Sequence, residues 1–224
     1  ISFHNWEFYH MNTPVETKQN LKIQAYSILK EKIVSCEYRP GSMLNEAQLA
    51  AELGFSRTPI REAISILEMD GFLRIVPKKG ILVTDILLGD IVQIFQARME
   101  IEPIALKLAG PNIPQEELLA WKEEFLADVS SIEHGYQADT AMHLGIIGYC
   151  NNSYIIDMMK KVFDKNTRII ICSTQNKAHM QDARKEHLEI LDYLLQQDFD
   201  QAAIKMRTHV AGCRNAAMDF FYST

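Results

Sequence analysis

The sequence predicts a mainly α-helical protein with two domains, a small N-terminal one that carries a β-hairpin and a C-terminal all-α bundle of about six helices. Three observations support this fold class. Apolar residues recur at helical spacing through most of the 224 residues, convincing strand patterns are confined to residues 72–84, and 47% of the chain is hydrophobic, enough to bury a core in each domain. We expect the first domain at residues 11–84, a linker at 85–88 and the second domain at 89–224.

The first domain opens with a predicted helix over residues 21–36, followed by a turn at the Pro-Gly pair 40–41. Asn45 and Gln48 then have the spacing of a capping box, which favours a short helix with the sequence AQLAAEL. Gly54 can close that helix because glycine adopts the left-handed conformation without strain.

A third helix follows after a tight turn. Ser56 is a natural N-cap residue. Pro59 fits the first turn, because N–H groups there have no intrahelical acceptor and the N–H that proline lacks is not needed. Gly71 ends the helix after Asp70.

Residues 72–84 are typical of a small hairpin. Two β-rich runs, 72–76 and 81–84, flank the basic turn Pro-Lys-Lys-Gly at 77–80. The order helix, helix, turn, helix, basic hairpin is that of a winged helix-turn-helix, in which the third helix enters the major groove of DNA and the wing contacts the backbone.

Arg57 and Arg61 lie on one face of the third helix, in its opening turns. Positive charge at a helix N-terminus opposes the macrodipole, so an attraction elsewhere must offset it. DNA phosphates and guanine edges would supply that attraction. The alternative is an ordinary solvated face on which Arg61 pairs with an acidic neighbour, and the capped turn and basic wing weigh against it.

The net charge of −6 argues at first against a polyanionic partner. The charge is unevenly divided, however, because residues 11–86 carry a net +1 and residues 87–224 a net −6. Any contact with nucleic acid must therefore come from the first domain.

The second domain shows long helical patterns and no convincing alternating strand. Breaks such as Gly-Pro-Asn at 110–112 and the Asn pair at 151–152 separate its helices. The expected helices are 89–109, 114–135, 138–151, 153–173, 179–197 and 199–220.

Ionisable side chains fall on the apolar faces of three of these helices. Asp139 and His143 are four residues apart on one stripe, and His187 and His209 each share a stripe with apolar residues. One carboxylate and three imidazoles that converge in a bundle suit a divalent metal ion, Zn²⁺, Ni²⁺, Mn²⁺ or Fe²⁺. For any one of these histidines alone, a hydrogen-bonded core residue is the simpler interpretation.

Arg98 also lies on an apolar stripe, and a buried guanidinium needs an anion. One hypothesis is an internal pair with an acid such as Glu102, one turn further on. The other is a bidentate contact with the carboxylate of a small ligand whose remaining oxygens reach the metal.

The segment LNEAQLAAELGFSRTPIREAISILEMDGFLRIVPKKGILV, residues 44–83, closely resembles the DNA-binding domain of GntR-type bacterial transcription regulators. The resemblance departs at Ala47, where some members carry a basic contact to the DNA backbone. It implies that the following residues face DNA: Ser56, Arg57, Thr58, Arg61 and, at the wing tip, Lys78, Lys79 and Gly80.

The second half resembles the FadR-type C-terminal ligand-binding domain, the FCD branch, in QARMEIEPIALKLA, DTAMHLGIIGYCNNSYI and KEHLEILDYLLQQDFDQAAIKMRTHV. The resemblance implies a metal site formed by Asp139, His143, His187 and His209. It also implies that Arg98 and Asn152 lie near an effector, with a helix cap as the simpler role of Asn152. Met142 and the pair Tyr149-Cys150 depart from the family pattern, so the effector is not transferred from any relative.

Four separated cysteines without a CxxC motif indicate neither a disulfide framework nor a thiolate zinc site, which fits a reducing cytoplasm. No apolar run approaches the roughly 18 residues that span a bilayer. Residues 1–10 precede Met11, which has the character of a natural start, and are expected to be a vector remnant.

Together these observations predict a cytoplasmic homodimer that binds a palindromic DNA operator and senses a small organic acid through a divalent metal ion. Two alternatives remain. In one, the metal stabilises the regulator and no organic effector exists. In the other the metal activates water in an enzyme, but the sequence shows no nucleophile motif and no clear general base, so no enzyme activity is expected.

Overall fold

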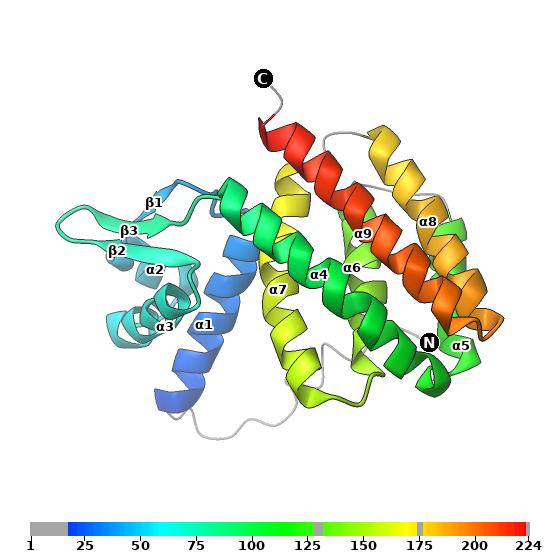
Figure 1. Cartoon of the computed structure of the whole chain (residues 1–224). Helices are drawn as coiled ribbons and strands as arrows, with labels where there is room; N and C mark the ends of the chain where they lie inside the picture. The colour runs from blue at the N-terminus through cyan, green and yellow to red at the C-terminus, as the bar shows by residue number, and fades with distance from the viewer. Residues whose placement is uncertain (1–17, 128–131, 174–176, 223–224) are drawn as a thin grey trace. The chain divides into compact units, whose positions relative to one another are not determined.

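The computed structural model describes residues 18–127, 132–173 and 177–222, so the predicted vector remnant at 1–10 lies outside the described residues. The chain divides into two compact units. The first consists of the described residues up to Ile33 together with Glu37–Asp85, and the second consists of Val34–Cys36 together with the residues from Ile86 onward. The first contains a small sheet beside short helices, and the second is wholly helical (Figure 1). The predicted fold class is confirmed.

The N-terminal unit is built from α1 (Lys18–Val34), α2 (Glu46–Leu53) and α3 (Arg57–Met69). The apolar stripes predicted for these helices point inward. Their fully buried side chains form the core of the unit and include Ala25, Leu29, Leu49, Ile60, Ala63, Ile64 and Leu67.

Local signals fix the start of α2 and the turn between α2 and α3. The Asn45 side chain accepts hydrogen bonds from the backbone N–H groups of Ala47 and Gln48, and Gly54 ends α2 in the left-handed region at φ 72°. Ser56 holds the extended N-cap conformation of α3, but its hydroxyl makes no capping hydrogen bond. The predicted cap position is therefore right, and the Ser56 hydroxyl does not satisfy an N–H of α3.

The sheet of this unit has the strand order β1-β3-β2, with β1 at Met43–Leu44, β2 at Leu73–Val76 and β3 at Gly80–Val83. The predicted hairpin is β2–β3, antiparallel and in register from Leu73 opposite Val83 to Val76 opposite Gly80. Strand β1 is too short for a periodicity to reveal it. Pro77 and Lys78 occupy the centre of a turn closed by the Lys79 N–H and the Val76 carbonyl, and Lys78 has φ 64°.

The C-terminal unit is a bundle in which α4 and α9 run side by side (Figure 1). Burial of Phe95, Met142, Phe163, Leu191 and similar residues forms one continuous core. The elements are α4 (Leu88–Ala109), the 3₁₀ turn η2 (Gly110–Asn112), α5 (Gln115–Leu126), α6 (Ile132–Gly148), α7 (Ser153–Ser173), α8 (Lys177–Leu195) and α9 (Phe199–Tyr222).

One helix boundary differs from the expectation of a helix through 114–135. The chain leaves helical geometry at Ala127, with φ −65° and ψ 152°, and α6 already begins at Ile132. Apolar periodicity continues across this break, so it could not reveal where α5 stops. The consequence for the site is that Asp139 and His143 sit in the middle of α6 and not near its start.

Gly145 lets α6 approach α5 closely. A Cβ atom at this position would lie 2.5 Å from Cζ2 of Trp121, so any larger residue would push the two helices apart. Because His143 lies half a turn earlier on α6, this contact also positions the site described below. Among the described residues, no helix is both long and apolar enough to cross a membrane.

Candidate metal centre and DNA-facing surface

Four side chains from three helices converge in the C-terminal bundle. Asp139 and His143 come from α6, His187 from α8 and His209 from α9, and one ligand atom of each lies within 4.8 Å of all the others. The three imidazoles are buried, and Asp139 is largely so. The apolar stripes around them account for this convergence, because each stripe turns its polar member toward the shared core.

The three histidines present their Nε2 atoms to a common centre. These atoms are separated by 3.3 Å (His143 and His187), 3.3 Å (His143 and His209) and 3.0 Å (His187 and His209). Nitrogen ligands about 2.0–2.1 Å from a metal lie roughly 3.0 Å apart in octahedral and roughly 3.4 Å apart in tetrahedral coordination. Asp139 Oδ1 lies 3.2 Å from His187 Nε2 and 3.8 Å from His143 Nε2. The donor set therefore fits a divalent cation.

Carboxylates outside the cluster orient two of the rings. Glu102 Oε2 lies 2.5 Å from His143 Nδ1, and Glu186 Oε2 lies 2.8 Å from His209 Nδ1. A carboxylate at Nδ1 fixes the tautomer that leaves Nε2 able to bind a metal. The buried Nδ1 of His187 makes no hydrogen bond with any residue in the described part of the chain, so this ring has no such partner there.

The electrostatics of the cluster favour the forms that bind metals. Burial lowers the pKa of His187, and burial with the neighbouring imidazoles lowers the pKa of His209 well below its usual value. Burial opposes ionisation of Asp139, but the hydrogen bond to His187 and nearby positive charge outweigh it and hold the pKa of Asp139 well below its usual range. Neutral imidazole and ionised carboxylate are the ligand forms that a metal requires.

Arg98 is fully buried and forms the internal pair that was one of its two predicted roles. Its Nε donates to Glu102 Oε1 at 2.5 Å, and its Nη1 donates to Asn166 Oδ1 at 2.9 Å. Glu102 thus links Arg98 to His143. The guanidinium carbon also lies 4.6 Å from the ring centroid of Phe163.

This network leaves two buried donors unsatisfied. Among the described residues, Arg98 Nη2 and Asn166 Nδ2 have no hydrogen-bond partner. Sequence reasoning did not single out Asn166 or Glu186. The only available signals were the polar position of Asn166 on the inner face of α7 and the place of Glu186 directly before a predicted ligand.

Asn152 does not join the cluster. Its side chain accepts hydrogen bonds from the backbone N–H groups of Tyr154 and Ile155, so it caps the N-terminus of α7. It is also absent from the walls of the cavity described next.

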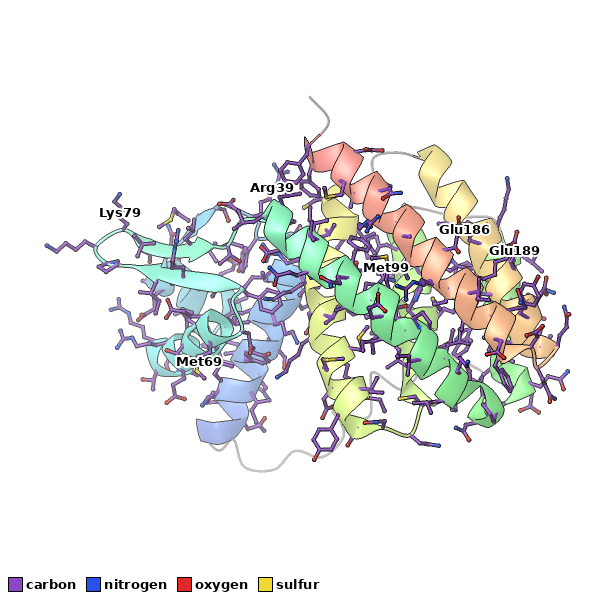
Figure 2. All side chains as sticks on the ribbon, in the orientation of Figure 1. Arg39, Met69, Lys79, Met99, Glu186 and Glu189 are labelled. Atoms are coloured by element: carbon purple, nitrogen blue, oxygen red, sulfur yellow. The ribbon has the colours of Figure 1, made fainter. Side chains whose placement is uncertain are left out.

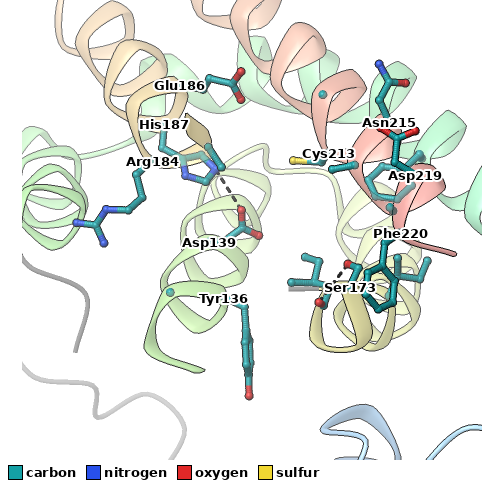
Figure 3. A pocket seen from close by; sticks show the side chains of 18 of the residues that line it. Tyr136, Asp139, Ser173, Arg184, Glu186, His187, Cys213, Asn215, Asp219 and Phe220 are labelled. Carbon is teal, nitrogen blue, oxygen red and sulfur yellow. Dashed lines mark hydrogen bonds and ion pairs between the residues drawn. The ribbon is translucent and has the colours of Figure 1, made fainter. Parts of the chain in front are cut away.

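A cavity of about 720 Å³ opens beside the cluster, a size usual for a small-molecule site. Asp139 and His187 form part of its wall, with Cys213 nearby (Figure 3). Phe95, Phe125 and Ile169 are among its apolar residues. Arg98 does not line it.

The residues predicted to face DNA are exposed in the N-terminal unit. Ser56, Arg57 and Thr58 lie at the start of α3, and Lys78 and Lys79 lie at the hairpin tip, where the Lys79 side chain projects away from the sheet (Figure 2). Gly80 follows with φ 128°, and a Cβ there would lie 2.7 Å from the Leu44 carbonyl oxygen. Glycine is therefore required by the sheet.

Arg61 is exposed and already paired. Its Nε and Nη2 donate to the two carboxylate oxygens of Glu46, in the first turn of α2, at 3.0 and 2.8 Å. An acidic partner, the alternative raised for this residue, is therefore present in the free chain. The contact fixes the guanidinium between α2 and α3.

A winged helix-turn-helix joined to a helical domain with a buried His/Asp cluster is the architecture of a two-domain DNA-binding regulator. Residues 21–83 match the family model described as "Bacterial regulatory proteins, gntR family", and residues 93–212 match the FCD domain. The second match alone covers more than half of the chain. The chain therefore belongs to the GntR family, in the branch with an FCD domain, and is a DNA-binding transcription regulator.

Individual proteins agree with this assignment. The chain is 25% identical over 193 residues to the uncharacterized HTH-type transcriptional regulator YdhC of Bacillus subtilis, covering 84% of this chain and 86% of that one. Its fold is similar to that of McbR/YncC of E. coli, with a TM-score of 0.77, 20% identity and coverage of 90% and 99%. It is also similar to the metal-free FCD domain of TM0439, with a TM-score of 0.55, 21% identity and coverage of 61% and 96%. A second curated relative, 24% identical over 201 residues, is named the HTH-type transcriptional repressor GlaR of Escherichia coli.

Proposed function

We propose that the C-terminal domain binds a divalent metal ion through Asp139, His143, His187 and His209, and that a small carboxylate bound beside this metal changes the affinity of the regulator for its operator. The observation that carries the proposal is that four largely buried ligand atoms converge in the bundle, and that two of the residues, Asp139 and His187, line a cavity large enough for a metabolite. When bound, the metal would supply a positive charge that attracts a carboxylate oxygen. The solved metal-free FCD domain of a structural relative makes metal content a natural first measurement.

Arg98 supports the site in two ways under this proposal. Through Glu102 it holds the tautomer of His143. Its Nη2 and Asn166 Nδ2 are buried donors with no partner among the described residues, but neither residue lines the cavity, so a ligand oxygen would have to reach past the lining residues to accept from them. A buried donor without a partner is costly, so an acceptor that reaches both would be stabilised. Asn152 contributes through the start of α7, as a cap.

The regulator acts, in this proposal, as a homodimer on a palindromic operator, because two-fold symmetry in the protein matches two half-sites in DNA. Ligand binding would shift the bundle between two packings and so change the spacing of the two recognition helices. Coupling of about 1–3 kcal/mol between ligand and DNA is typical of such switches.

Elemental analysis of the purified protein tests the metal site. We expect about one divalent ion per chain in the wild type and loss of that ion in His143→Ala and His209→Ala. His134→Ala is the matched control, because His134 lies on the same helix as His143 but pairs with Glu124 and not with the cluster. Full metal retention in both cluster variants would refute the site.

A thermal-shift screen of small carboxylates, with and without chelator, tests the effector. A ligand that binds the folded state raises the melting temperature by an amount that grows with the ratio of its concentration to its Kd, and a metal-dependent ligand does so only in the absence of chelator. If no carboxylate responds while the metal still stabilises the protein, the metal-only alternative is the correct one.

A further inference from the structure

The walls of the cavity differ in charge along its length. Asp139 and His187 of the metal cluster lie at one end, and Asp219 and Phe220, from the last turns of α9, lie across the cavity with Ser173 of α7 (Figure 3). Ten residues of α9 separate His209 from Asp219, about 15 Å along the helix axis at 1.5 Å per residue. A ligand that touches both ends must therefore be elongated.

The lining side chains that the structure describes carry more negative than positive charge. Asp139, Glu186 and Asp219 are acids, and Arg184 is the basic residue among them. Arg184 is committed elsewhere, because its Nη2 donates to the backbone carbonyls of Phe125, at 2.6 Å, and Ala127. No lining cation in the described part of the chain is thus left to receive a second ligand carboxylate.

Asp219 differs from the other two acids. Asp139 contacts His187, and Glu186 contacts His209, but Asp219 makes no ion pair or hydrogen bond with any described residue. It is exposed at the rim, next to the exposed ring of Phe220. Asp219 and Phe220 both line the cavity, and a carboxylate and an aromatic ring each attract a positively charged amine.

The stretch between the two ends is apolar, with Phe95, Ile169 and Ala217 buried along it. Hydrocarbon placed there loses contact with water at no cost in hydrogen bonds, whereas a polar group would lose its hydration. The middle of the ligand is therefore expected to be aliphatic or aromatic.

We propose that the effector is a zwitterion, with a carboxylate at the metal end of the cavity, an apolar middle, and a positively charged amine beside Asp219 and Phe220. This inference rests on the proposed function, since it needs the metal to hold the carboxylate. It separates amino acids with a terminal amine from dicarboxylates, whose second carboxylate would face the charge of Asp219.

Isothermal titration calorimetry of the metal-loaded full-length protein with three ligands of equal carbon number tests the inference. The probes are 8-aminooctanoate, octanoate and octanedioate, with the six-carbon and ten-carbon members of each series to allow for length. We expect 8-aminooctanoate to bind roughly three- to tenfold more tightly than octanoate, as an exposed ion pair with an aromatic neighbour allows. Octanedioate should bind more weakly than octanoate, and added salt should shrink both differences.

Asp219→Asn should remove the preference for the amine, and the affinity for octanedioate should become close to the affinity for octanoate. Asp157→Asn is the control, because Asp157 is an exposed aspartate of α7 that does not line the cavity. The inference is overturned if the diacid binds the wild type as tightly as the amino acid, or if Asp219→Asn leaves all three affinities unchanged.

The outcomes separate this inference from the function beneath it. If octanoate binds in a metal-dependent way but the affinities of the three probes do not follow the expected order, only the inference that the effector is a zwitterion is overturned. If none of the chains binds at any length, or if binding persists after the metal is removed with chelator, the proposed carboxylate site fails and the inference fails with it.

Discussion

Glu102 is the residue whose replacement should disturb the C-terminal domain most, because it is fully buried between Arg98 and His143. Glu102→Gln keeps the shape of the side chain and removes its charge. The guanidinium of Arg98 is then left buried with only neutral acceptors. Loss of one partner of a buried ion pair costs about 3–5 kcal/mol, which corresponds to roughly 6–20 °C in melting temperature for a protein of this size.

The same variant should weaken metal binding. Glu102 fixes the tautomer of His143 from outside the cluster, and removal of such a partner lowers metal affinity about 10–100-fold. Arg98→Met with Glu102→Gln separates the two effects, because the double variant removes the unpaired charge but does not restore the carboxylate. We expect it to recover stability and to keep the weakened metal binding.

Thermal unfolding followed by circular dichroism, in chelator, measures the first effect, and metal titration measures the second. Glu100→Gln is the matched control, because Glu100 also lies on α4 and pairs with an arginine, but on the surface. It should melt close to the wild type and bind metal normally. Melting temperatures and metal affinities that are the same in Glu102→Gln and Glu100→Gln would refute the role assigned to this carboxylate.

Three further changes test other parts of the structure. Arg61→Ala should weaken operator binding and lower the slope of affinity against salt by about one, in a titration at several salt concentrations; an unchanged slope would contradict the assignment of α3. Gly145→Ala should destabilise the domain by about 1–3 kcal/mol through its clash with Trp121, whereas Gly148→Ala, with open space around its Cβ, should not. Burial lowers the pKa of His209 below 6.5, so the unfolded chain binds more protons below that pH. The metal-free protein should therefore lose stability as the pH falls from 7.5 to 5, and His209→Gln should lose less.

The N-terminal domain was predictable in detail because its signals are local. Asn45, Gly54 and Gly71 each fix a turn through their own backbone or side chain, and the hairpin turn follows from a proline and a glycine three residues apart. Strand β1 escaped prediction because two residues carry no periodicity, and its partner lies far along the chain.

The C-terminal site was predictable only in part, because its contacts are long-range. The stripes on three helices indicated which histidines point inward. The stripes could not show that the Glu102 carboxylate would bind both Arg98 and His143, since the contact with His143 spans 41 residues of the sequence. The end of α5 at Ala127 was missed for a related reason, as an apolar pattern continues beyond the residue at which the backbone turns away.

Because Arg61 is paired with Glu46, the Glu46 carboxylate competes with DNA for the Arg61 guanidinium. If Arg61 contacts DNA, it must first leave a carboxylate that already offers two well-placed oxygens. A phosphate can replace that arrangement with two charged oxygens, and a guanine edge can replace it with two neutral acceptors. Glu46 would then compete with either kind of DNA contact, so DNA binding through Arg61 requires the domain to give up this ion pair.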